Sequence, residues 1–168
     1  MNSHERTDKQ PMSRGQYPST RMRRTRMTSF SRRLVAETRL DIADLIWPLF
    51  VIDGENITQP VDTMPGVWRY SIDQLLKQAA KAVELTIPAI SIFPCIDPSL
   101  RDDSGSLARD GDNLVCTAVR AIKAVYPDLG IVCDVALDPF TTHGHDGLLE
   151  NDEILNDQTV SVLCVQAI

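Results

Sequence analysis

Three short apolar runs alternate with three amphipathic segments, and this order is the feature that most constrains the fold. The runs are residues 45–53, 87–96 and 130–138, and each has the length and composition of a strand buried on both faces. Strands separated by helices in this way are typical of parallel sheets with right-handed crossovers. The sequence therefore predicts an α/β fold built on a parallel sheet.

The amphipathic segments predict helices over residues 71–85, 112–127 and 156–168. Ser71 and Gln74 form a candidate capping box at the first start, and Asp112 and Asp157 are candidate caps of the other two. We expect the following side chains to form the buried faces: Ile72, Leu75, Leu76, Ala79, Ala82 and Val83; Leu114, Val115, Ala118, Val119, Ile122 and Val125; Val160, Leu163, Cys164 and Ala167.

The chain of 168 residues is long enough for one domain with a sizeable core. We find no apolar run near the roughly 18 residues of a membrane helix and no secretory pattern, so we expect a cytoplasmic protein without a membrane partner. The four cysteines are far apart in sequence and form no CxxC pair. We therefore expect them to be buried small hydrophobic residues in a reducing compartment.

Positive charge gathers in residues 1–33, which hold nine Lys and Arg against two acidic residues, whereas the rest of the chain is strongly acidic. A nucleic-acid partner is one interpretation of such a segment. No interleaved aromatic residues or groove-reading motif accompany it, so we expect no nucleic-acid partner. We favour an N-terminal arm over residues 1–33 that lies on an acidic surface, such as that of a partner subunit, and a folded domain over residues 34–168.

The segment DVALDPFTTHGHDGL, which overlaps the end of the third apolar run, carries the candidate site. It contains Asp134, Asp138, His143, His145 and Asp146. In parallel α/β folds, catalysis and ligand binding concentrate where strands end, and carboxylates with imidazoles suit Mg²⁺, Mn²⁺ or Zn²⁺. From spacing alone, a metal site and a solvated loop remain equally good interpretations.

No other constellation of reactive groups stands out in the sequence. It lacks a GxSxG motif and a glycine-rich phosphate loop with lysine. The lysines of the folded part are Lys77, Lys81 and Lys123, all on predicted helices, where we expect solvated side chains. None of them is expected at a strand end, where a Schiff-base lysine would lie.

Several segments together resemble the porphobilinogen synthase (5-aminolevulinate dehydratase) family: RRLVAETRLDIADLIWPLFV, TMPGVWRYSIDQL, IPAISIFP, NLVCTAVRAIKAVYPDLGIVCDVALDPFTTHGHDGL and ILNDQTV. The resemblance runs from about residue 20 to the C-terminus. It implies the first three βα units of a (β/α)₈ barrel, preceded by an arm that wraps a neighbouring subunit, usually in an octamer. It also implies the condensation of two 5-aminolevulinate molecules to porphobilinogen, the monopyrrole of haem and other tetrapyrroles.

The resemblance also bears on the metal. Zinc-dependent members bind Zn²⁺ through three cysteines, and the matching positions here are Ala136, Asp138 and Asp146. The chain thus resembles the Asp-type branch. The resemblance implies an allosteric Mg²⁺ bound outside this segment, and no catalytic Zn²⁺. Asp138 and Asp146 would then hold a hard or monovalent cation, or only water and hydrogen bonds, and His145 and Asp134 would order the loop.

The resemblance finally implies that catalytic groups are missing. The family forms Schiff bases on two lysines of later barrel strands, and no residue of this chain matches them. We therefore assign no catalytic residue here and expect no activity from this chain alone. The alternative function is a truncated, non-catalytic half-barrel. A third hypothesis is a stand-alone metal-binding module that uses Asp134, Asp138, His143 and Asp146.

Overall fold

The computed structural model describes residues 15–21 and 23–168, and the chain divides into two units, Met1–Leu40 and Asp41–Ile168. The predicted boundary after residue 33 stays a prediction, and the part of the arm over residues 1–14 lies outside the described residues. Among the described helices, none combines the length and the apolar character that a membrane span needs.

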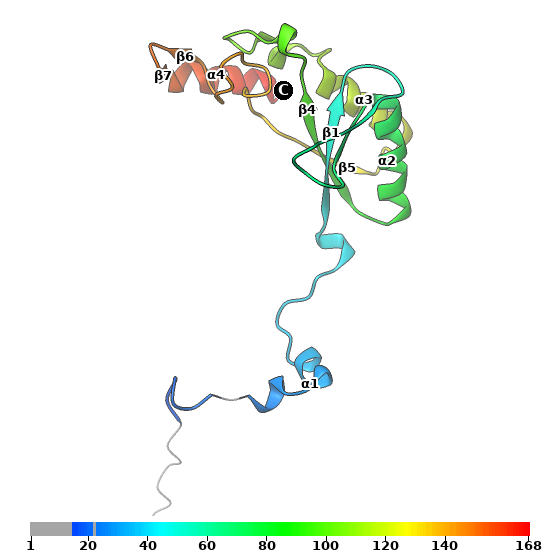
Figure 1. The fold of residues 1–168 in the computed structure, drawn as a ribbon, viewed down its shortest axis with the longest axis vertical. Coiled ribbons are helices and arrows are strands. Elements are labelled where there is room, and N and C mark those ends of the chain that lie inside the picture. Colours follow the sequence, from blue (N-terminus) through cyan, green and yellow to red (C-terminus); the bar gives the residue numbers. More distant parts are fainter. Residues whose placement is uncertain (1–14, 22) are drawn as a thin grey trace, which may run out of the picture. The chain divides into compact units, whose positions relative to one another are not determined.

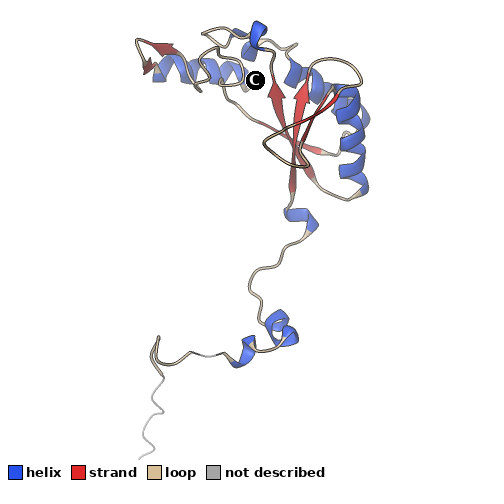
Figure 2. Cartoon of the chain, viewed as in Figure 1, coloured by secondary structure: helices blue, strands red, loops and turns tan. Residues whose placement is uncertain are grey.

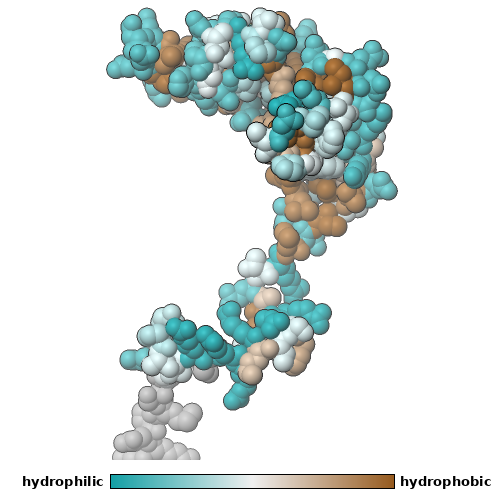
Figure 3. Space-filling model, in the orientation of Figure 1, coloured by the Kyte–Doolittle hydropathy of each residue, from teal (hydrophilic) through white to brown (hydrophobic). Residues whose placement is uncertain are grey.

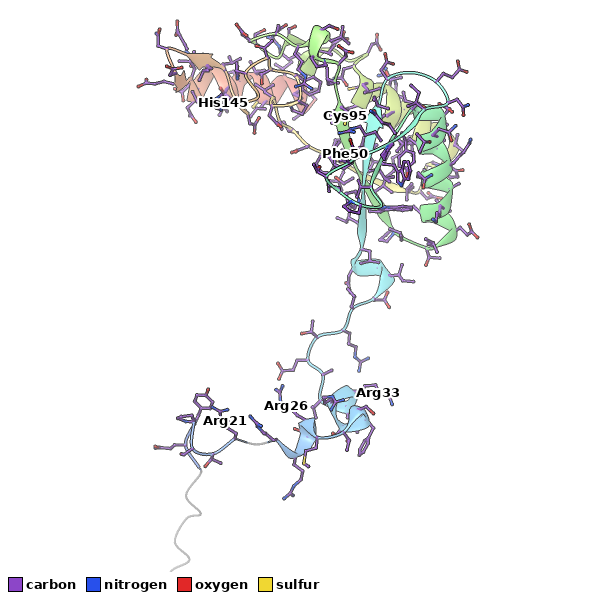
Figure 4. All side chains as sticks on the ribbon, in the orientation of Figure 1. Arg21, Arg26, Arg33, Phe50, Cys95 and His145 are labelled. Carbon is purple, nitrogen blue, oxygen red and sulfur yellow. The ribbon has the colours of Figure 1, made fainter. Side chains whose placement is uncertain are left out.

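The described part of the first unit contains two short helices, η1 (Arg24–Arg26) and α1 (Ser29–Leu34). Thr28 caps α1 in a reciprocal capping box with Ser31, which satisfies backbone donors that a six-residue helix would otherwise leave free. Basic side chains are spread along this unit, as Arg21, Arg26 and Arg33 show in Figure 4. Local hydrogen bonds and charge, rather than a buried core, characterise this segment.

The second unit carries the predicted alternation of strands and helices (Figures 1 and 2). Its elements in chain order are η2 (Ile42–Asp44), β1 (Ile46–Ile52), β2 (Thr58–Pro60), β3 (Trp68–Tyr70), α2 (Ile72–Glu84), β4 (Ala89–Cys95), η3 (Pro98–Leu100), η4 (Ser106–Arg109), α3 (Leu114–Val125), β5 (Gly130–Cys133), β6 (Leu149–Glu150), β7 (Glu153–Ile154) and α4 (Asn156–Gln166). The four shortest strands were not predicted, because two or three residues give no periodic signal.

The larger sheet has the strand order β2-β3-β1-β4-β5. β1 pairs along its whole length with β4 in parallel, and β4 pairs in parallel with β5. β3 is also parallel to β1, whereas the edge strand β2 is antiparallel to β3. The predicted α/β fold with a parallel sheet is therefore confirmed, with an added antiparallel edge.

The core lies between one face of this sheet and the helices α2 and α3. Alternate residues of β1 and β4 point to this face, and the helices contribute alanines that allow close approach. The fully or nearly fully buried members are Leu49, Val51, Leu75, Ala79, Ala82, Ile90, Ile92, Ala118, Ile122 and Leu129. Val83 and Val125, which we expected in the buried faces, are about half exposed at the edges of the helices.

The helix starts differ in detail from the prediction. Ser71 precedes α2 but makes no capping bond, because its hydroxyl donates to Asp73 and accepts the Ile57 N–H at 2.8 Å. α3 is capped by Asn113, whose side chain accepts the Cys116 N–H at 3.0 Å, and not by Asp112. Buried Asn113 is thus the residue that fixes the start of α3.

The last helix also departs from expectation. α4 begins after Leu155, so Asp157 lies within its first turn rather than at the cap. Val160, Cys164 and Ala167 are exposed, and only Leu163 of the predicted face is half-buried. Thr159, Val162 and Leu163 instead pack near the Leu137 and Phe140 cluster, a shift of the buried face by about one residue.

Two further corrections concern the strands and thiols. β5 ends at Cys133 rather than at residue 138, so the segment after it leaves the sheet earlier than its apolar character predicts. Pro48 is tolerated inside β1 because the pairing of β1 with β3 begins only at Phe50. The cysteines are free but not buried: Cys95 and Cys116 are half-buried, and Cys133 and Cys164 are exposed.

Candidate active site

The predicted aspartates lie where the parallel strands end. Asp134 follows β5 directly, at the same edge as the ends of β1 and β4, and Asp138 lies four residues further on. Both residues are exposed. In open parallel sheets, this carboxyl edge is where ligands bind, so the position of both carboxylates agrees with a site.

Three carboxylates influence one another at this edge. The pKa of Asp138 is raised, first by burial of its carboxyl group and then by the negative charges of Asp146 and Asp134, while Arg101 opposes the shift. Asp138 is exposed as a whole residue, so solvent limits the effect. The fold therefore favours the protonated form of the Asp138 carboxyl group.

Asp146 has a structural contact of its own. Its Oδ1 accepts the backbone N–H of Leu137 at 2.6 Å, across nine residues of sequence. Leu137 and Phe140 are buried together with Ile96 and Ala108 in a second, smaller apolar cluster. One carboxylate oxygen of Asp146 therefore fixes the loop, and this apolar cluster anchors that loop from below.

The two histidines lie side by side in the same loop. Their ring centroids are 5.5 Å apart, and the His143 Nδ1 accepts the backbone N–H of His145 at 3.1 Å. His143 is half-buried and His145 is exposed. Thr141 donates its hydroxyl hydrogen to the His145 carbonyl at 3.0 Å, which orders the backbone between the histidines and the aspartates.

A second loop, residues 96–113, packs against the loop of residues 139–148 that carries the two histidines (the histidine loop). Asp102 and Thr141 form an isolated parallel β-bridge, and the Thr142 hydroxyl donates to the Asp103 carboxylate. Arg101 donates to the Ile96 carbonyl at 2.8 Å, which keeps its charge near Asp138. The contact between the two loops joins residues about 40 positions apart in the sequence, so the spacing of residues within one loop could not reveal it.

The string DDSGS in this second loop did carry a signal. Asp102 accepts hydrogen bonds from the backbone and hydroxyl groups of Ser104 and Ser106. These bonds, those of Ser106 first, hold the pKa of Asp102 well below its usual range. Asp followed by Ser and Gly is typical of side chains that close turns on their own backbone, so the string predicts an ordered loop.

The described residues do not fit a resident metal. No group of three or more His, Cys, Asp or Glu side chains within residues 15–21 and 23–168 could hold a metal ion. The hypothesis of a stand-alone metal module from Asp134, Asp138, His143 and Asp146 is therefore not supported by the geometry. The expected role of Asp138 and Asp146 in holding a cation stays a prediction.

The three lysines of the second unit lie on the helices, as predicted, and not at the carboxyl edge. Lys77 and Lys81 are on α2, and the Lys81 ammonium lies 5.8 Å from the Trp47 ring centroid. Lys123 on α3 donates to the carbonyls of Pro127 and Leu129. All three are exposed residues, and no desolvated amine faces the carboxylates.

An apolar cavity of about 610 Å³ borders the carboxylates. Its wall includes Phe50 and Phe93 of the sheet face away from the helices, whose rings are 5.9 Å apart. It continues past Cys133 and Asp134 to side chains of α3 and α4. Because β5 is last in the strand order, the cavity runs along a sheet edge that has no strand partner among the described residues.

Known proteins are similar to this chain in sequence and in fold. A family model described as Delta-aminolevulinic acid dehydratase matches residues 19–168. A delta-aminolevulinic acid dehydratase of Bradyrhizobium diazoefficiens is 56% identical over 148 residues, which are 88% of this chain and 42% of that protein. The chloroplastic delta-aminolevulinic acid dehydratase 1 of Arabidopsis thaliana is 39% identical over 155 residues, 89% of this chain and 35% of that protein.

A solved structure is similar as well. The crystal structure of delta-aminolevulinic acid dehydratase (porphobilinogen synthase) from Toxoplasma gondii, in complex with the reaction product porphobilinogen, matches with a TM-score of 0.84 and 39% identity. The match covers 89% of this chain and 43% of that one, so the chain spans less than half the length of these relatives. On a family match that covers residues 19–168, the chain belongs to the delta-aminolevulinic acid dehydratase family.

Proposed function

We propose that this chain forms the N-terminal part of a porphobilinogen synthase, a lyase that condenses two 5-aminolevulinate molecules to porphobilinogen in tetrapyrrole biosynthesis. The observation that carries the proposal is the similarity to a structure that holds porphobilinogen, over 89% of the chain. The carboxylates of Asp134 and Asp138 at the carboxyl edge of the sheet support it, because this edge is where such folds bind substrates.

We further propose that β1, β4 and β5 are the first three strands of a (β/α)₈ barrel. The support is their mutual parallel pairing, with α2 and α3 on one face of the sheet, and the cavity along the outer edge of β5. An unpaired strand edge next to an apolar cavity is suited to a further strand. We therefore interpret much of this cavity as the place of a missing strand rather than as a ligand pocket.

Within this proposal, the chain's own residues shape and charge one side of the substrate site. Asp138 can hold a proton at its carboxyl group more readily than an isolated aspartate. The side chains of Asp146 and His143 and the backbone of His145 order the loop that carries it. The amines that attack 5-aminolevulinate are not among Lys77, Lys81 and Lys123, so they come from polypeptide outside this chain.

We propose Mg²⁺ rather than zinc as the metal of the complete enzyme, bound outside this segment. The support is the donor chemistry: a methyl group stands at Ala136, and Asp138 and Asp146 supply oxygen rather than sulfur. Among residues 15–21 and 23–168, no group of three or more His, Cys, Asp or Glu side chains offers a site for the ion within this segment. Chelation of zinc is expected to leave the activity of the complemented enzyme unchanged.

We also propose that residues 1–33 mediate homo-oligomerisation, as an arm on another copy of the chain in an octamer. The support is the charge asymmetry between this basic segment and the acidic remainder. We propose in addition that the protein is cytoplasmic. The support is that the four cysteines are far apart in the sequence and form no CxxC pair, which suits a reducing compartment. Deletion of residues 1–33 should reduce the assembly measured by analytical ultracentrifugation.

A complementation assay tests the main proposal. The chain would be mixed with a polypeptide that covers the remaining length of the Bradyrhizobium diazoefficiens relative, and porphobilinogen would be measured after addition of 5-aminolevulinate. We expect product from the mixture and none from either part alone. Turnover by the chain alone, or none by a mixture that has assembled, would contradict the proposal.

Two variants make this assay specific. Asp138→Asn should lower product formation by the mixture by about 100-fold, the size expected for a group that assists proton transfer. Lys77→Gln on the exposed surface of α2 is the matched control and should have no effect. Borohydride trapping with 5-aminolevulinate should modify only the complementing polypeptide, and an adduct on Lys77, Lys81 or Lys123 would place the chemistry here instead.

A further inference from the structure

Both ring nitrogens of His143 are engaged in hydrogen bonds. Nε2 lies 3.2 Å from the backbone carbonyl oxygen of Asp103, which belongs to the second loop. Nδ1 accepts the backbone N–H of His145 at 3.1 Å. No other described side chain of the histidine loop makes a bond of each kind, one within the loop and one to the backbone of residues 96–113.

The partners determine which nitrogen carries the hydrogen. A backbone carbonyl can only accept, so Nε2 must be the donor, and a backbone N–H can only donate, so Nδ1 must be the acceptor. The imidazole is therefore neutral, with its hydrogen on Nε2, when both bonds are present. Either the other tautomer or a ring turned over would lose both bonds at once.

The other hydrogen bonds between the loops involve backbone groups and one hydroxyl. The Thr142 N–H donates to the Asp102 carbonyl at 3.2 Å, and the Asp102 N–H donates to the Phe140 carbonyl at 3.3 Å. The Thr142 hydroxyl donates to the Asp103 carboxylate. The bond from His143 to the Asp103 carbonyl adds one more hydrogen bond between the two loops.

We propose that His143 is a positioning residue whose neutral imidazole clasps residues 139–148 to residues 96–113. The path from the clasp to the carboxylates is short: His143 holds the His145 backbone, Asp146 follows, and Asp146 holds the N–H of Leu137 next to Asp138. The clasp is a property of the two loops alone, and only its effect on catalysis rests on the proposed function.

The neighbouring histidine offers a matched control. The His145 ring is exposed and makes no hydrogen bond within the described residues, although it lies 5.5 Å from the His143 ring. His145→Gln should therefore change the loop contact little. The two imidazoles are alike in chemistry and differ in their bonds, so a difference between their variants reports the bonds.

A direct test is the tautomer of His143 in the full chain. Long-range ¹H–¹⁵N correlation spectra at about pH 8, where histidines are mostly neutral, distinguish a protonated from an unprotonated ring nitrogen. We expect His143 to show hydrogen on Nε2 and an unprotonated Nδ1. Hydrogen on Nδ1, or rapid averaging of both tautomers as we expect for the exposed His145 ring, would overturn the clasp.

Two substitutions separate its two bonds, because each reproduces one nitrogen. In His143→Asn, the side-chain oxygen lies where Nδ1 was and can accept the His145 N–H, but the side chain is too short to reach Asp103. In His143→Gln, the amide nitrogen lies where Nε2 was and can donate to Asp103. Hydrogen exchange of the His145 amide reports the first bond, and that of the Thr142 amide reports the contact between the loops.

In His143→Gln, we expect the protection of the His145 amide to fall about tenfold, which corresponds to the loss of one hydrogen bond. In His143→Asn, this protection should persist. The protection of the Thr142 amide should show the opposite pattern. Equal loss at both amides in both variants, or no loss in either, would overturn the proposal. These measurements need no substrate, so they remain informative if the complementation assay fails.

Discussion

The two faces of the parallel sheet differ in how completely this chain covers them. Toward α2 and α3, Val51, Ile90 and Ile92 are fully excluded from solvent. On the opposite face, the aromatic pair Phe50 and Phe93 remains half-buried and borders the cavity. The comparison teaches that α2 and α3 close the core on one face of the sheet, while the face that borders the candidate site stays open among the described residues.

Substitution of adjacent residues on the two faces gives the largest expected effect. Ile92→Ala should lower the free energy of unfolding by about 3 kcal/mol, because it leaves a cavity in a packed core. Phe93→Ala removes a ring that is already partly solvated and should cost about 1 to 2 kcal/mol. Urea unfolding followed by circular dichroism measures both, and a larger loss for Phe93→Ala would reverse the comparison.

The start of the covering helix α3 tests the helix side further. Asn113→Ala should cost about 1 to 2 kcal/mol, since Asn113 is buried, caps the helix and donates to two loop carbonyls. Asp112→Ala removes only the exposed pair with Arg120 and should cost at most about 0.5 kcal/mol. Thermal or urea unfolding of the two variants distinguishes these residues. Equal losses would restore Asp112 as the cap.

The smallest effect is expected on the open side, at Asp138. Its pKa is raised in the fold, so the stability linked to its protonated form is present below the pKa of the unfolded chain and is lost as the pH rises through the folded pKa. Asp138→Asn should therefore stabilise the fold at neutral pH by less than about 1 kcal/mol, and the gain should vanish in acid.

Unfolding measured at several pH values would show this crossover. Asp128→Asn is the matched control, because it removes one negative charge in the exposed turn before β5. Its effect on stability should not show this crossover with pH. A gain from Asp138→Asn that persists at about pH 3, where most aspartates are protonated, would indicate another cause.

The sequence predicted those parts of the fold in which burial imposes a period. β1, β4, α2 and α3 agree closely with the expected ranges, because long buried runs and amphipathic faces leave a strong pattern. β5 was predicted too long because Val135, Ala136 and Leu137 are apolar, yet Leu137 serves the second cluster rather than the sheet. The cysteines were misjudged because burial of a thiol depends on its neighbours, and Cys133 lies on a strand edge.

The sequence predicted where the candidate residues lie in the fold, but not their contacts. The positions of Asp134 and Asp138 followed from strand order, since parallel strands end at one edge. The contributions of Arg101, Asp102 and Asp103 did not, because they meet the histidine loop only through folding across about 40 residues. The sequence pattern also did not reveal that hydrophobic side chains gather at the surface around the start of β1 (Figure 3). They are Leu45, Ile46, Trp47, Leu85 and Ile87.

The outer edge of β5 has a consequence for the kinetics of assembly. Backbone donors and acceptors on an open strand edge bind any extended segment, so they discriminate poorly between a correct strand and one from a second copy. A strand tethered in the same molecule arrives at a high effective concentration, whereas a separate polypeptide must diffuse to the edge. Dilution should therefore slow two reactions of the β5 edge alike: pairing with a second copy of the chain and pairing with the complementing polypeptide. Only side-chain contacts with the cavity wall can favour the second reaction over the first.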